Sequence, residues 1–110
     1  MRRHLLTDLE LMILLAILRT GEEAYGVQIA REIEATGGRR LLLGAAYAAL
    51  DRLERNGLVS STVGSPTQER GGRAKRFFKV TPRGVRAARD TQQALVALWR
   101  GVPELKERPT

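Results

Sequence analysis

The spacing of apolar residues changes twice along this 110-residue chain, and this change constrains the fold more than any other feature. Apolar residues recur at helical spacing up to Gly57, alternate with polar residues from Val59 to Val63, and return to helical spacing after Thr81. A second short run of strand-forming residues, which includes Phe77 and Phe78, precedes that return. We therefore expect a mainly α protein with a small two-stranded sheet between its helices.

Three helices are predicted before the strands. The first begins at a capping box, in which the Thr7 side chain caps free amides and Glu10 reaches back, and it runs to about Arg19. The second is expected over about residues 25–35 and the third over about residues 44–55. A short extended connector joins these two, so the pair has the layout of a helix-turn-helix.

Two strands and a last helix complete the predicted order. The strands cover residues 59–63 and 76–80, and the loop of residues 64–75 between them is too long for a tight hairpin. A helix then starts at Pro82, whose fixed backbone angle suits a first turn, and it reaches about Arg100. The order is that of a winged helix-turn-helix with a β-wing, extended by a C-terminal helix.

The charge of the chain points to a polyanionic partner. Nineteen Lys and Arg residues against twelve Asp and Glu residues give a formal net charge of +7. The excess is local, because residues 70–89 include eight basic residues and no acidic one. Such a patch attracts nucleic acid more often than any other polyanion, although a basic surface that serves solubility alone is the alternative. An aromatic content of 5% argues against an RNA-binding sheet that stacks bases.

The third helix has the pattern of a DNA-reading helix. Ala46, Leu50 and Leu53 fall on one face, which we expect to pack inward. The opposite face carries small residues with cations behind them, and a helix with a small leading surface can approach base edges in the major groove. The alternative is an ordinary solvent-facing surface. Tyr47 is expected to be half buried, to donate to a phosphate oxygen, or to do both.

The wing is the second predicted contact with double-stranded DNA, because it combines flexible glycines with four cations. A mobile loop without a partner is the alternative. The predicted DNA-binding residues of the connector, the third helix and the wing are Arg39, Arg40, Gly44, Ala45, Tyr47, Ala48, Arg52, Arg55, Arg70, Arg73, Lys75 and Arg76.

The first and last helices predict a homodimer. Residues 11–18 are apolar on every side, which indicates burial on more than one face, and the last helix carries a heptad seam about two repeats long. Packing of this seam on its own domain is the alternative. The predicted dimer interface comprises Leu11, Leu14, Leu15, Leu18, Ala88, Thr91, Leu95, Leu98, Trp99 and Val102. We expect residues 1–84 to form the winged helix-turn-helix and residues 85–110 to form the dimerisation helix and a short tail, as one compact unit.

No catalytic, metal or cofactor site is predicted. The chain has no cysteine, and its only histidine, His4, lies near the N-terminus, so neither a thiolate nor a Ser-His-Asp arrangement is expected. The longest apolar run, residues 11–18, is far shorter than the roughly 18 residues that a membrane-spanning helix needs. These features favour a cytoplasmic protein that is not an enzyme.

Four segments, in this order and spacing, resemble the PadR family of regulators. They are residues 24–29 (AYGVQI), 43–53 (LGAAYAALDRL), 56–59 (NGLV) and 72–84 (GRAKRFFKVTPRG). The resemblance extends over about residues 5–100 and is closest to the short subfamily, in which a single helix follows the winged part.

The resemblance implies a dimer whose first and last helices exchange contacts, with two heads on a pseudopalindromic operator. It also implies repression, relieved in many members by a small-molecule effector or another signal. Some short members hold flat drugs between paired tryptophans, but the register here places Leu95 at that position and Trp99 one turn later. A winged helix that binds another protein, without sequence-specific DNA binding, is the alternative function.

Overall fold

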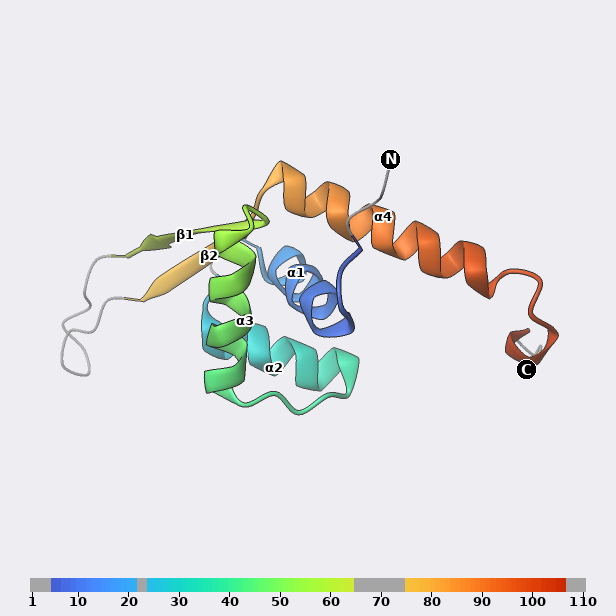
Figure 1. Cartoon of the computed structure of the whole chain (residues 1–110). Helices are drawn as coiled ribbons and strands as arrows, with labels where there is room; N and C mark the ends of the chain where they lie inside the picture. The colour runs from blue at the N-terminus through green and yellow to red at the C-terminus, as the bar shows by residue number, and fades with distance from the viewer. Residues whose placement is uncertain (1–4, 22–23, 65–74, 107–110) are drawn as a thin grey trace.

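A computed structural model of the chain describes residues 5–21, 24–64 and 75–106. These residues form helices around a central α1, with a two-stranded sheet on one side and a last helix that extends away on the other (Figure 1). The elements are α1 (Asp8–Thr20), α2 (Gly26–Gly37), α3 (Leu43–Arg55), β1 (Val59–Val63), β2 (Arg76–Val80), α4 (Pro82–Trp99) and the short 3-10 helix η2 (Pro103–Leu105). The prediction of a mainly α winged helix is confirmed.

Local sequence signals set the helix ends. The Thr7 hydroxyl accepts a hydrogen bond from the Glu10 amide at 3.2 Å, and the Glu10 carboxylate accepts one from the Thr7 amide at 2.8 Å. This is the predicted capping box. Helix α2 continues past the predicted end to Gly37, because Gly38 adopts the left-handed conformation (φ +70°) that closes a helix.

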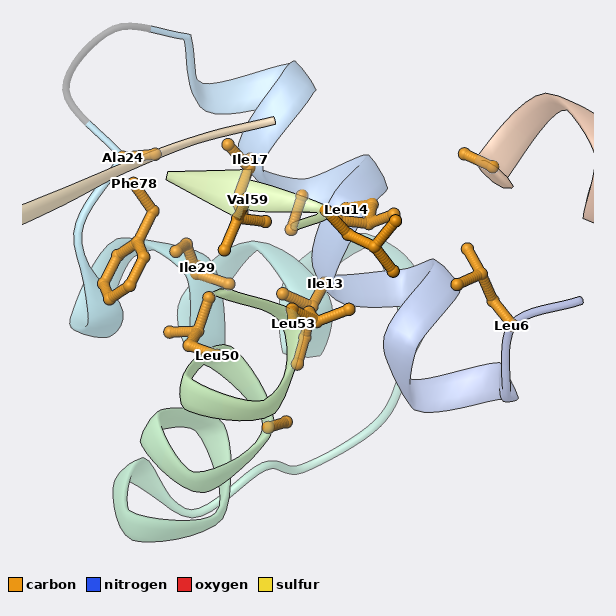
Figure 2. Packing of buried hydrophobic residues seen from close by; sticks show 14 of the residues in the cluster. Leu6, Ile13, Leu14, Ile17, Ala24, Ile29, Leu50, Leu53, Val59 and Phe78 are labelled. Atoms are coloured by element: carbon orange, nitrogen blue, oxygen red, sulfur yellow. The ribbon is translucent and has the colours of Figure 1, made fainter. Parts of the chain in front are cut away.

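Helix α1 lies at the centre of the core and packs against α2, α3, α4 and β2. Figure 2 shows Ile13, Leu14 and Ile17 of α1 facing side chains from α2, α3 and the sheet. Each fully buried aliphatic side chain of this size contributes about 1.5–3 kcal/mol. The prediction that α1 is buried on more than one face is confirmed, but the elements that bury it belong largely to the same chain.

This arrangement corrects one predicted interface residue. Leu14 is 0% exposed within the single chain, so it has no surface left for a second copy. Leu11 is partly buried, whereas Leu15 and Leu18 are about half exposed. Only the last two of the four α1 residues present much apolar surface to a partner.

The two strands pair antiparallel, with Val59 opposite Val80 and Val63 opposite Arg76. The segment before α2 joins the sheet as well, because the Phe78 amide donates to the Ala24 carbonyl oxygen at 2.7 Å. Phe78 itself is buried in the core. The sheet is therefore held to the helices by the hydrogen bond to Ala24 and by the burial of the Phe78 ring in the core.

Helix α4 has two different halves. Its first half packs on α1, and the Leu6 amide donates to the buried Thr91 hydroxyl at 3.0 Å, which in turn donates to the Ala87 carbonyl oxygen. Beyond Thr91 the helix leaves the core (Figure 1). The heptad seam is thus divided: Ala88 and Thr91 are buried in their own domain, against the prediction, while Leu95 and Leu98 are exposed.

Gly84 in the first turn of α4 tests this packing. A Cβ at this position would overlap the Leu58 carbonyl oxygen and lie 2.7 Å from Val80 Cγ1. The carbonyl oxygen belongs to the backbone, so it cannot move aside as a flexible side chain could. We expect Gly84→Ala to destabilise the fold by about 2–3 kcal/mol, seen as a melting temperature lowered by roughly 10 °C.

Gly44→Ala is the matched control, because nothing lies within 4 Å of a Cβ built at residue 44. Alanine there should stabilise α3 by about 0.5 kcal/mol, since it removes backbone entropy from the unfolded chain. Equal melting temperatures for both variants would contradict the close contact at Gly84.

Candidate nucleic-acid interface

The front of helix α3 is exposed and small. Gly44, Ala45 and Ala48 all face solvent, while Ala46 and Leu50 on the opposite face are completely buried. The predicted inward face of Ala46, Leu50 and Leu53 is confirmed, and it also includes Ala49. The buried face fixes the rotation of α3, so the small residues stay outward.

Two cations flank this small surface. Arg52 and Arg55 are exposed in the last turn of α3. Their guanidinium groups can bind guanine edges or phosphates, and the methyl groups of Ala45 and Ala48 can contact thymine methyl groups. The small residues allow the helix to come close to base edges in a major groove, and the two arginines supply positive charge beside them.

Tyr47 lies between α2 and α3 rather than on the front. It is half buried, its ring centroid lies 6.4 Å from that of Phe78, and a Cβ at Gly26 would come within 2.5 Å of Tyr47 Cζ. The missing side chain of Gly26 therefore leaves the space that the phenol ring fills. Of the two expected roles of Tyr47, burial is observed, and the phosphate contact stays a prediction.

The connector before α3 presents its two predicted arginines differently. Arg39 donates to Asp8 Oδ2 at 3.1 Å and ties the connector to the start of α1. Arg40 is exposed. An exposed ion pair such as Arg39–Asp8 is worth well under about 1 kcal/mol, so a phosphate can compete for the Arg39 guanidinium.

The base of the wing is built on aromatic contacts. The Tyr25 and Phe77 rings meet edge to face at 6.0 Å, and Lys75 Nζ lies 4.6 Å from the Tyr25 ring centroid. Lys75 is exposed and remains available to a phosphate. The predicted wing cations Arg70 and Arg73 lie outside the described residues.

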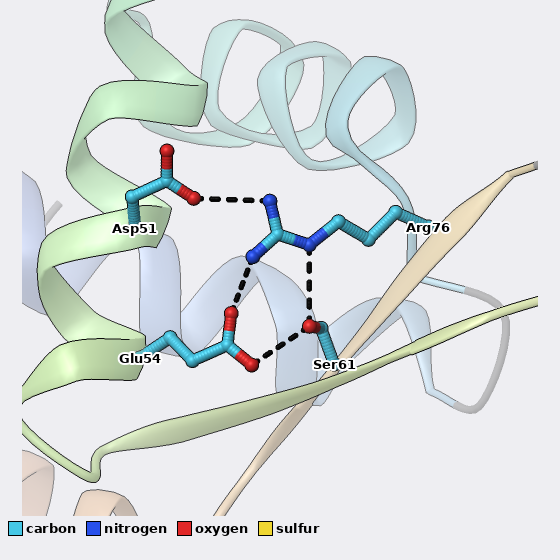
Figure 3. A network of polar contacts seen from close by, with 4 residues as sticks. All are labelled: Asp51, Glu54, Ser61 and Arg76. Carbon is cyan, nitrogen blue, oxygen red and sulfur yellow. Dashed lines mark hydrogen bonds and ion pairs between the residues drawn. The ribbon is translucent and has the colours of Figure 1, made fainter.

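Arg76 departs from its predicted role. Its side chain turns toward α3, where Nη1 donates to Asp51 Oδ1 at 3.0 Å and Nη2 donates to Glu54 Oε1 (Figure 3). Nε donates to Ser61 Oγ at 3.2 Å, and Ser61 Oγ donates to Glu54 Oε2 at 2.8 Å. We name Asp51, Glu54, Ser61 and Arg76 the clamp. Arg76 therefore joins β2 to α3 and is not free on the wing surface.

The clamp favours the charged forms of Glu54 and Arg76. The Ser61 hydroxyl and then the Arg76 guanidinium lower the pKa of Glu54, against the opposing effect of partial burial. Burial lowers the pKa of Arg76, but hydrogen bonds to Asp51 and Glu54 outweigh it and raise that pKa. Both groups are thus ionised at neutral pH.

The sequence does not reveal the clamp partners of Arg76. They lie 15, 22 and 25 residues away along the chain, beyond any local spacing rule. The only available signal was the pair of carboxylates at Asp51 and Glu54, three residues apart and therefore on one side of α3.

Other chemistry finds little support in the part of the chain that the structure describes. There, no three His, Cys, Asp or Glu side chains are close enough together to hold a metal ion. Among the same residues, no helix combines the length and apolar character needed to cross a membrane.

Comparison with known proteins identifies the family. The model of the transcriptional regulator PadR-like family matches residues 14–90. No curated protein matches the sequence. Members of the matched family are transcriptional regulators and not enzymes, in agreement with the expectation from sequence.

Solved structures share the fold. A PadR-like transcriptional regulator from Bacillus cereus strain ATCC 14579 superposes with a TM-score of 0.68 at 22% identity, over 92% of this chain and 93% of that one. A PadR family regulator from Clostridium difficile R20291 gives 0.66 at 22% identity, over 84% and 91%. A transcriptional regulator from Clostridium thermocellum gives 0.68 at 19% identity, over 89% of each chain. The family match over most of the chain, on the winged fold described above, shows that this protein belongs to the PadR-like family of transcriptional regulators.

Proposed function

We propose that the chain is a repressor that binds a pseudopalindromic operator as a homodimer, with α3 of each copy in the major groove. The observation that carries this proposal is the exposed front of α3, where Gly44, Ala45 and Ala48 lead and Arg52 and Arg55 flank them. The side chains at the front would read base edges. Arg40, in the connector before α3, and Lys75, at the start of β2, are both exposed. They would bind phosphates and so fix the position of the protein along the duplex.

The surface of the single chain supports the dimer. Leu95 is 54% exposed, Leu98 76% and Trp99 56%, all on the half of α4 that leaves the core. A second apolar surface lies on α1, where Leu15 and Leu18 border a groove of about 420 Å³ between α1 and α2. Apolar side chains gathered in this way mark an interaction surface. Two copies related by a twofold axis would cover both surfaces at once.

The dimer sets the form of the operator. Two linked heads on one face of the duplex would meet half-sites one helical turn, about 10 base pairs, apart. Binding there would exclude other proteins from the same DNA, which is the simplest route to repression.

Selection of bound fragments from genomic DNA tests the proposal. We expect enriched fragments to share an inverted repeat, and their affinity to fall linearly with the logarithm of salt concentration. A folded protein that enriches no sequence, yet captures a protein partner, would favour the alternative of a protein-interaction module.

A further inference from the structure

The clamp uses every nitrogen of the Arg76 guanidinium. Nη1 meets Asp51, Nη2 meets Glu54 and Nε meets Ser61, so one planar group holds α3 and both strands of the wing together. The guanidinium also lies over the Phe78 ring, with Arg76 Cζ 4.8 Å from the ring centroid. A planar group with donors in fixed directions suits such bridging, whereas a lysine ammonium does not reproduce it.

We propose that Arg76 is a positioning residue: through Asp51 and Glu54 it fixes the angle between the wing and α3, and it does not bind phosphate. The proposal rests on the proposed DNA-binding function and deepens it. In the sheet, Arg76 pairs with Val63, the last residue of β1, so the clamp acts at the end of the ladder farthest from α4.

The charge of the clamp argues against a phosphate site. One guanidinium faces two carboxylates, which gives the cluster a formal charge of −1. A phosphate that approached Arg76 would meet Asp51 and Glu54 as well, and like charges at this distance repel. Arg52 and Arg55 are the neighbours of these carboxylates on α3, and both are exposed. Within the described residues, neither of them forms an ion pair with a carboxylate.

The geometry gives the clamp a mechanical purpose. The segment before α2 holds the sheet at Phe77 and Phe78, but β1 and β2 pair only with each other toward Val63 and Arg76. A ribbon of two strands is marginally stable and strongly twisted, so this end does not hold one direction by itself. Asp51 and Glu54 belong to the helix that would enter the major groove, and Arg76 belongs to the wing. Locking the two together presents both elements to DNA in one arrangement, which lowers the ordering cost of binding.

Equilibrium binding of an operator duplex by Arg76→Gln and Glu54→Gln, over roughly 50–200 mM salt, tests the proposal. A positioning role predicts about tenfold weaker binding by Arg76→Gln with the slope of log affinity against log salt unchanged. It also predicts several-fold weaker binding by Glu54→Gln, although this variant removes a negative charge. The double variant should be no weaker than Arg76→Gln, because both changes break one clamp.

Two results would overturn the proposal. A salt slope reduced by about one unit in Arg76→Gln would make Arg76 a phosphate ligand. Tighter binding by Glu54→Gln would mean that Glu54 acts only as a repulsive charge. Arg31→Gln and Glu34→Gln, at exposed positions on α2, are the matched controls for lost charge and should change affinity little.

Hydrogen exchange of the strand amides in the free protein separates this proposal from the proposed function. Both clamp variants should lose protection at the Val63–Arg76 end of the ladder while their helices stay protected. If the parent protein binds no DNA, the proposed function fails, and the exchange result still decides whether the clamp holds the wing. Unchanged protection in both variants would contradict the clamp.

Discussion

Ala48→Glu is expected to abolish operator binding while the fold stays intact. Ala48 is exposed at the front of α3, so glutamate there meets no buried neighbour and changes stability by only about 0.5 kcal/mol. In the major groove, however, the glutamate side chain would occupy the space between α3 and the base edges. Its carboxylate would also lie near the phosphates and be repelled by their negative charge. We expect affinity to fall at least about a hundredfold, at the upper end of the effect of a lost base contact. Fluorescence anisotropy with a labelled operator measures it.

Ala35→Glu is the matched control, since Ala35 is an exposed alanine on α2. This variant adds the same charge to the same domain away from the front of α3, and it should bind nearly as the parent does. Circular dichroism melts should show both variants folded. Normal operator binding by a folded Ala48→Glu protein would place the DNA-reading surface elsewhere.

The second large effect is expected from Leu95→Asp/Leu98→Asp, which should convert the proposed dimer to a folded monomer. Both leucines are exposed in the single chain, so their loss leaves its core untouched. Burial of each in a dimer contributes about 1.5–3 kcal/mol, and the new carboxylates add a desolvation penalty. Separated heads lose the linkage advantage, so operator affinity should fall by about 10²-fold or more. Sedimentation velocity at micromolar concentration reports the change in mass.

Gln93→Asp/Ala97→Asp provides the matched control for this pair. Both positions are exposed on the side of α4 opposite to Leu95 and Leu98, so the same two charges enter the same helix without touching the apolar face. This variant should remain a dimer. A parent protein that sediments as a monomer and binds the operator no better than the leucine variant would refute the proposed dimer.

Much of the fold follows from local patterns. Helix and strand periods, the Thr7 capping box and the inward face of α3 each depend on residues a few positions apart, and the structure has them where they were expected. The exposed front of α3 follows from the same helical geometry, because a helix that buries one face must show the other.

Long-range packing could not be obtained in this way. An apolar stripe does not reveal whether its own chain or a second copy covers it. The sequence pattern therefore predicts Leu14, Ala88 and Thr91 in the dimer interface, whereas their own domain buries them. Its positive charge alone predicts a DNA contact for Arg76. Its carboxylate partners sit on another element, and only the folded chain brings them within 3.0 Å.

Sequence-specific reading of DNA by α3 is tested most directly by one ratio: the affinity for the selected operator over that for a scrambled duplex of the same length, at about 150 mM salt. We predict a ratio of about 10³ or more for the parent protein, as specific regulators show. Equal affinity for the two duplexes would contradict the proposed operator recognition and leave only nonspecific attraction between a basic protein and a polyanion.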